Sequence, residues 1–281
     1  MSLSITALVL TAALLHALWN ALVKGATDKT VILGLIALGH VVPGLVVVVV
    51  APLPGWDIWP YIAASTVIHW GYYYFLNTAY HHGDLSVMYP IARGLAPVLI
   101  ALGAQFWVGE SLPLLAWAGI ICVSGGIMVL TKGAFTGALP MKGLLAALAC
   151  AIMVASYSLV DGIGVRLSAN ALAYVGWLFV MEFIVAGFVF STRWQRLRAL
   201  PHKVIMLGFL GGVISGTAYG LVLYAKTFAP LGLVSALRET SVIFAAMIGV
   251  MWFGEGPKGN RLLAAAIVMG GIILIGIGSR A

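Results

Sequence analysis

Two stretches of this chain repeat each other at a constant distance of 145 residues. Residues 93–127 and 238–272 share an arginine, a Trp-x-Gly-Glu turn and a Gly-Gly-Ile sequence, all in one register without a gap. Unrelated apolar segments often share alanine and valine by chance, but they rarely share a set of this kind. The pattern therefore indicates an internal duplication.

The repeats lie in a chain that is almost filled with apolar segments. Only 8% of its residues are charged, whereas soluble domains carry roughly 25%. A helix that crosses a bilayer needs about 20 mostly apolar residues, and ten such segments are found. They cover residues 3–23, 30–51, 58–80, 85–108, 112–131, 142–165, 170–191, 203–226, 230–253 and 259–279.

The duplication pairs the fourth segment with the ninth and the fifth with the tenth. Each half then holds five helices, and an odd number forces the two halves into opposite membrane orientations. We therefore predict an all-α membrane protein, with ten transmembrane helices as two inverted five-helix repeats around a central cavity. The predicted halves are residues 1–131 and 142–281, joined by a linker at 132–141.

The formal charge of +7 reflects topology rather than nucleic-acid binding, because the basic residues sit in short loops between apolar segments. Alternate loops hold ten lysines and arginines against three, the three being Arg166, Lys226 and Arg280. The richer side is expected in the cytoplasm, which places both termini outside. Cys122 and Cys150 fall inside apolar segments, so no disulfide framework or metal site is predicted.

Several charged residues fall deep inside the apolar segments. Arg93 and Arg238 lie about 12 Å into their helices at 1.5 Å per residue. A charge at mid-membrane costs about 2.5–3.5 kcal/mol, so such groups face the protein interior or water. Structural ion pairing and a role in substrate binding or gating both remain open for the two arginines. Since Glu239 adjoins Arg238, Arg93 is the better candidate to meet a ligand carboxylate.

Aromatic and amide side chains accompany these charges at helical spacing. Their polar atoms would be too deep for an interfacial belt, so they predict a water-filled cavity. Pro90 and Pro97 are expected to kink the fourth segment beside it. The candidate substrate-binding residues are Trp19, Asn20, Tyr73, Asn77, Tyr80, Tyr89, Arg93, Tyr157, Tyr219, Arg238 and Glu239.

Two further patterns are interpreted structurally. Glycines recur every four residues at 208, 212, 216 and 220, which predicts a close helix contact. His81-His82-Gly83-Asp84 is interpreted as a solvated turn rather than a metal site, so neither a metal nor a cofactor is expected.

These motifs resemble those of the EamA-type ten-helix permeases of the drug/metabolite transporter superfamily, and most of all the bacterial aromatic amino-acid exporters. The matching residues are Trp19-Asn20, Lys24, Met88-Tyr89-Pro90, Arg93, Pro97-Val98, Gly109-Glu110, Gly254-Glu255 and the closing Gly-Gly helices. The sequence departs from the pattern at Asn20, where many members have glycine, and at Val242-Ile243, which replace Pro-Val.

The resemblance implies export of amino acids and related metabolites from the cytoplasm by alternating access, across the bacterial inner membrane. The aromatic residues favour aromatic or apolar amino acids, and the Lys/Arg bias predicts termini in the periplasm. A monomer is expected. Efflux of organic cations or drugs is the alternative within transporters. A lipid-modifying membrane enzyme is the alternative from another class, but no catalytic constellation supports it.

Overall fold

The computed structural model describes residues 1–23, 28–82, 85–131, 140–253 and 258–279, and every regular element in these ranges is helical. The all-helical membrane class predicted from the sequence is thereby confirmed. The elements are α1 (Leu3–Val23), α2 (Lys29–Val50), α3 (Trp59–His82), α4 (Leu85–Gly103), η1 (Ala104–Val108), α5 (Leu114–Val129), α6 (Met141–Leu167), α7 (Ala171–Met181), α8 (Phe183–Ala199), α9 (His202–Lys226), α10 (Leu231–Arg238), α11 (Ser241–Phe253) and α12 (Lys258–Gly278).

Three pairs of these elements continue one another: α4 with the π-helical η1, α7 with α8, and α10 with α11. The described part of the chain therefore forms ten rods, one for each apolar segment of the sequence. Eight of them are long and apolar enough to cross a membrane. The other two are α5, with 16 residues, and the less apolar α3, with 24 residues. That these two also cross the membrane stays a prediction.

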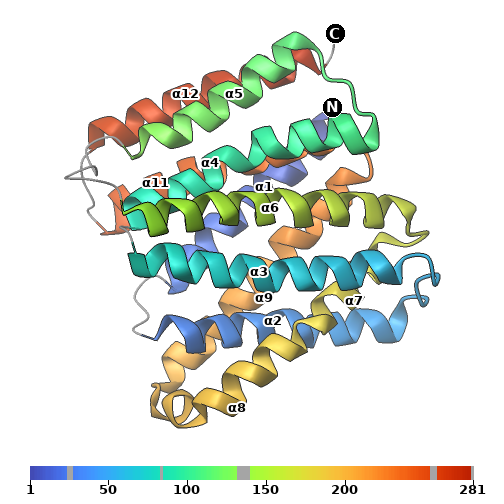
Figure 1. The fold of residues 1–281 in the computed structure, drawn as a ribbon, viewed down its shortest axis with the longest axis vertical. Coiled ribbons are helices and arrows are strands. Elements are labelled where there is room, and N and C mark those ends of the chain that lie inside the picture. Colours follow the sequence, from blue (N-terminus) through green and yellow to red (C-terminus); the bar gives the residue numbers. More distant parts are fainter. Residues whose placement is uncertain (24–27, 83–84, 132–139, 254–257, 280–281) are drawn as a thin grey trace.

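The rods lie roughly side by side, with α5 and α12 paired at one edge of the bundle and α8 at the opposite edge (Figure 1). α3 and α4 both pack on α6, and in the same way α9 and the α10–α11 rod pack on α1. In the two predicted halves, α1, α3 and α4 correspond to α6, α9 and the α10–α11 rod. Replacing each helix by its counterpart therefore turns the first set of contacts into the second. This reciprocity supports the duplication.

The contacts between α5 and α12 show the same symmetry between the halves for individual residues. A methyl group added to Gly119 would lie 2.6 Å from the carbonyl oxygen of Gly271, and one added to Gly126 would lie 3.1 Å from that of Ala264. A shift of 145 residues turns the first contact into the second. Residue numbers rise along one helix as they fall along the other, so the pair is antiparallel. Antiparallel partners are what inverted repeats require, and the half boundaries remain our proposal.

The glycine stripe on α9 packs against α2, as predicted. A methyl group at Gly212 would lie 2.8 Å from Cα of Gly39, and one at Gly208 would lie 2.9 Å from Leu35. Small residues at such a crossing let two backbones approach closely in the absence of a hydrophobic driving force between helices. Gly216 continues the stripe beside His40.

Two of the rods are interrupted at a glutamate, of which Glu239 is buried and Glu182 is partly buried. Glu182 lies between α7 and α8 with φ −69° and ψ −8°, and Glu239 lies between α10 and α11 with φ −68° and ψ −7°. Pro90 and Pro97 both lie within the continuous helix α4, and the kink expected there stays a prediction. At the α10–α11 interruption, Glu239 is followed by Thr240 and Ser241, which have lower helix propensity than alanine or leucine.

Both ends of the chain lie at the same end of the bundle. The amino group of Met1 is 3.5 Å from the carbonyl oxygen of Ser279. This agrees with an even number of membrane crossings.

Candidate substrate-binding site

Arg93 and Glu239 form a buried ion pair between the two predicted halves. Arg93 donates from Nη2 to Oε1 of Glu239 at 2.7 Å and from Nε to Oε2 at 3.2 Å. The two residues are 4% and 3% exposed. Glu239 therefore neutralises Arg93 rather than its neighbour Arg238, which is the structural ion pairing that the sequence analysis left open. A contact of Arg93 with a ligand carboxylate stays a prediction. Adjacent residues on a helix point in different directions, so proximity in sequence was misleading.

Among the described residues, the Arg238 guanidinium has no carboxylate partner. It lies instead against the ring of Tyr219, whose centroid is 5.9 Å from Cζ of Arg238. Arg238 is 7% exposed, so its charge is held largely away from solvent. A contact of cation and aromatic ring contributes about 0.5–2 kcal/mol, less than a paired carboxylate would.

Asp161 on α6 accepts hydrogen bonds from two tyrosine hydroxyls. Tyr174 donates to Oδ1 at 2.8 Å, and Tyr219 donates to Oδ2. Asp161 is fully buried, and both of its oxygens are thus already engaged. Tyr219 therefore contacts two charged groups. Its hydroxyl donates to the buried Asp161 carboxylate, and its ring face lies against the Arg238 guanidinium.

Tyr157 lies at the centre of the aromatic side chains. Its ring stacks on His69 at 4.1 Å, with Tyr72 at 5.9 Å and Tyr219 at 6.1 Å in edge contacts. It also lies within electrostatic range of Arg93 and Tyr89. We use the name central cluster for Tyr89, Arg93, Tyr157, Tyr219, Arg238 and Glu239, which the sequence analysis selected and the structure brings together.

The remaining candidates lie outside this cluster. Trp19 donates to Nδ1 of His16 at 3.3 Å and packs toward α2, and Asn20 donates to the carbonyl oxygen of His16 at 2.7 Å. Asn77 is exposed near the end of α3. Tyr73 faces Glu182 rather than the arginines. The side chain of Tyr80 lies outside the described residues, as do Gly83, Asp84 and the second Gly-Glu turn.

His16 was not among the selected residues, although α1 places it within electrostatic range of both arginines. Its position three residues before Trp19 was the available signal. A histidine within an apolar segment is, however, more often a hydrogen-bonded interior group than a ligand contact.

Lys226 was assigned to a loop, but it is fully buried at the end of α9. Its Nζ donates to the carbonyl oxygen of Ser158 at 2.8 Å and to the hydroxyl at 3.2 Å. No sequence pattern distinguishes a buried lysine at a helix end from a loop lysine that sets membrane orientation. Removing it from the loop count leaves ten basic residues on one side against two, Arg166 and Arg280.

A polar network closes the end of the bundle at which α6 and α9 end. Arg166 pairs with Glu110 at 2.8 Å and donates to the carbonyl oxygens of Lys226 at 2.7 Å and Ala229 at 2.8 Å. Both carboxylate oxygens of Glu110 accept from the backbone N–H of Leu231, at 3.0 and 2.8 Å. We call Glu110, Arg166 and these backbone partners the end seal. It joins α6, the α9–α10 connection and the turn before α5.

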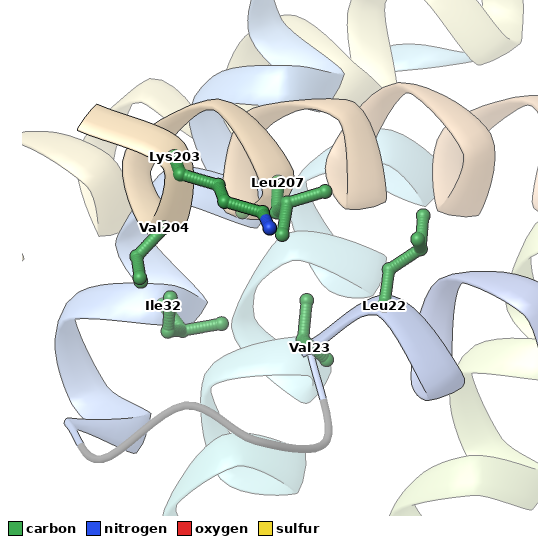
Figure 2. Close-up of a pocket in the computed structure, with 7 residues that line it drawn as sticks. Leu22, Val23, Ile32, Lys203, Val204 and Leu207 are labelled. Carbon is green, nitrogen blue, oxygen red and sulfur yellow. The ribbon is translucent and has the colours of Figure 1, made fainter. Parts of the chain in front are cut away.

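A cavity lies at the opposite end of the bundle. It has a volume of ≈ 220 Å³ and is lined by the end of α1 and the starts of α2 and α9. Figure 2 shows Lys203 extending along α9 toward Leu207 among apolar side chains. A second cavity of ≈ 10 Å³ lies beside Tyr73 and Glu182. Neither of these two cavities is lined by a central-cluster arginine, and the hollow expected at these residues stays a prediction.

Comparison with known proteins agrees with this architecture. Residues 141–277 match the model of the EamA-like transporter family. The Chloramphenicol-sensitive protein RarD of Pseudomonas aeruginosa is 25% identical over 222 residues, which cover 77% of this chain and 69% of that protein. An "Uncharacterized transporter in cobO 3'region" of Sinorhizobium sp. is 23% identical over 99 residues, 35% of this chain and 70% of the relative.

A solved crystal structure shares the fold with a TM-score of 0.78 at 21% identity, over 100% of this chain and 99% of the other. The helical bundle with its buried charges and these relatives define a multi-pass membrane transporter of small molecules, not an enzyme. Residues 141–277 are thus similar to the EamA-like transporter family, and the similarity to RarD over a longer stretch supports the drug/metabolite transporter superfamily.

Proposed function

We propose that this protein exports amino acids, preferably aromatic or apolar ones, from the cytoplasm by alternating access between its two halves. The observation that carries the proposal is the buried Arg238 guanidinium, which has no carboxylate partner in the described part of the chain. A substrate carboxylate would supply that partner through charge-assisted hydrogen bonds.

The charges of the central cluster favour a substrate with a carboxylate. Arg93, Arg238 and Glu239 together leave one positive charge in excess. An α-amino acid brings a carboxylate to that excess and an ammonium group that Glu239 can attract. An organic cation would add a second unpaired positive charge in a low-dielectric region, which is costly. Cation efflux is therefore the less favoured alternative.

The aromatic members of the cluster suit an aromatic substrate side chain. Tyr157 and Tyr219 already pack edge to face with centroids 6.1 Å apart. Aromatic pairs of this kind contribute about 0.5–1.5 kcal/mol beyond their buried area. A phenylalanine or tyrosine ring inserted beside them would gain similar contacts.

The two ends of the bundle support an alternating-access cycle. The end seal closes the side on which both termini lie, while the ≈ 220 Å³ cavity lies at the opposite end. The basic loop residues place the cavity side in the cytoplasm by the positive-inside rule. On this orientation the termini are periplasmic, and substrate enters from the cytoplasm through movement that opens the central cluster.

Counterflow in liposomes tests the proposal. Purified protein is loaded with unlabelled amino acid, and entry of labelled phenylalanine, tyrosine or leucine is compared with entry of a labelled aromatic amine. We expect accelerated entry of the amino acids. Acceleration by the amine alone would replace amino-acid export with cation efflux, and no acceleration by any amino acid would refute the proposed function.

A further inference from the structure

A second pair of titratable side chains, one buried and one partly buried, lies away from the central cluster. His40 on α2 is 7% exposed, and its Nδ1 lies 3.0 Å from Oε2 of Glu182. Both ring nitrogens of His40 and this oxygen lack a well-aligned hydrogen bond within the described residues. The central cluster uses neither residue, so the pair needs an explanation of its own.

At this distance the two groups attract each other only when one of them carries a hydrogen, because a deprotonated imidazole nitrogen and a carboxylate oxygen both present lone pairs. With two exchangeable protons the pair is neutral overall, and with one it carries a net negative charge. A net charge in the membrane interior is costly, so protonation favours burial and deprotonation favours contact with water.

The surroundings offer this proton a route. Glu182, His69 and Tyr73 line the ≈ 10 Å³ cavity, which has room for about one water molecule. α3 contributes the titratable His69 and Tyr73, and no arginine or lysine lines this cavity.

The elements packed against His40 leave its ring close to backbone. On α9 the nearest residue is Gly216, where an added methyl group would lie 3.0 Å from His40, and on α7 Phe179 stacks on the ring at 5.1 Å. Tyr219 on α9 reaches His69, at 6.2 Å, and is a candidate link to the central cluster.

The position of Glu182 connects protonation to backbone movement. Glu182 forms the interruption between α7 and α8, and α2 packs against both helices. Interrupted helices near mid-membrane are typical elements of transporter sites. A change of charge at Glu182 therefore acts where the α7–α8 rod already departs from helical geometry.

We propose that His40 and Glu182 form a proton-binding site separate from the substrate site, whose protonation state controls the relative position of α2 and the α7–α8 rod. Release transfers one proton to the water of the adjacent cavity and leaves a carboxylate beside the imidazole. Proton and substrate then bind at the same time rather than competing for one carboxylate. The proton site does not depend on the proposed substrate, whereas its coupling to amino-acid movement rests on the proposed function.

Infrared difference spectroscopy of the full protein during pH titration tests the proton site without any substrate. We expect a protonated-carboxyl band that disappears in Glu182→Gln, shifts in His40→Gln and persists in Asp57→Asn, a control at an exposed carboxylate. Spectra of the wild type and Glu182→Gln that match throughout the titration would overturn the proposal.

Transport then tests the coupling. In liposomes with an imposed pH gradient, the wild type should accumulate labelled phenylalanine, whereas Glu182→Gln and His40→Gln should lose accumulation but retain counterflow. Gradient-driven accumulation that survives in Glu182→Gln would overturn the coupling. Loss of counterflow in variants with unchanged thermal unfolding would overturn the separation of the two sites. Failure of wild-type counterflow with the carboxyl band intact would refute only the proposed function.

Discussion

Arg93 on α4 and Glu239 at the α10–α11 interruption form a two-point ion pair across 146 residues of sequence. This pair joins the predicted halves at the centre of the bundle, and it leaves Arg238 without a carboxylate partner among the residues that the structure describes. The substrate hypothesis depends on this difference between Arg93 and Arg238, because the two arginines occupy equivalent positions in the sequence repeat.

Removing one member of the Arg93–Glu239 pair should destabilise the protein strongly. Breaking a buried pair costs about 3–5 kcal/mol, because the remaining charge stays uncompensated. Arg93→Met and Glu239→Leu should each lower the thermal unfolding temperature in detergent, and the double variant should lose less than the sum. Strict additivity of the two effects would show that the pair does not interact.

Substitution of Arg238 should weaken substrate binding more than it weakens folding. Hydrogen bonds to charged groups contribute about 1.5–3 kcal/mol, so Arg238→Gln should lower the apparent affinity for phenylalanine by about 10- to 100-fold. Counterflow at a series of concentrations measures the change. Unaltered affinity would remove Arg238 from the substrate site.

Weakening the end seal should favour opening at the side of the termini. Arg166→Gln loses the ion pair with Glu110 and donors to two carbonyl oxygens. In a Cys122→Ser, Cys150→Ser background, the buried Ala229→Cys should then react faster with a membrane-impermeant thiol reagent. Lys142→Gln, at an exposed position at the start of α6, is the control and should leave the labelling rate unchanged. Equal labelling of Arg166→Gln and its parent would contradict a gating role for the seal.

The α2–α9 contact should tolerate no added side-chain atoms. Gly212→Ala places a methyl group against the α2 backbone, and overpacking of this kind costs about 1–3 kcal/mol. Gly270→Ala on α12 is the matched control, because a methyl group there meets nothing within 4 Å. Gly212→Ala should therefore lower the thermal unfolding temperature, whereas Gly270→Ala should not. A similar temperature for both variants would place the close contact in doubt.

The sequence predicted the helical class and the glycine contact because both depend on local periodic patterns. It also selected Arg93, Arg238 and Glu239, because charged side chains inside apolar segments are conspicuous. The pairing was assigned incorrectly, since adjacency in sequence does not determine which side chains face each other. The His40–Glu182 contact joins two helices distant in sequence, and the burial of Lys226 depends on how α9 meets α6. Neither has a local pattern that reveals it.

The most direct test compares phenylalanine with phenethylamine, which keeps the ring and the amine but lacks the carboxylate. Counterflow of each should be measured with the wild type and with Arg238→Gln in liposomes. We predict that the wild type transports phenylalanine in strong preference to phenethylamine, and that Arg238→Gln loses this preference. Equal transport of both compounds by the wild type, or an unchanged preference in the variant, would contradict carboxylate recognition at Arg238.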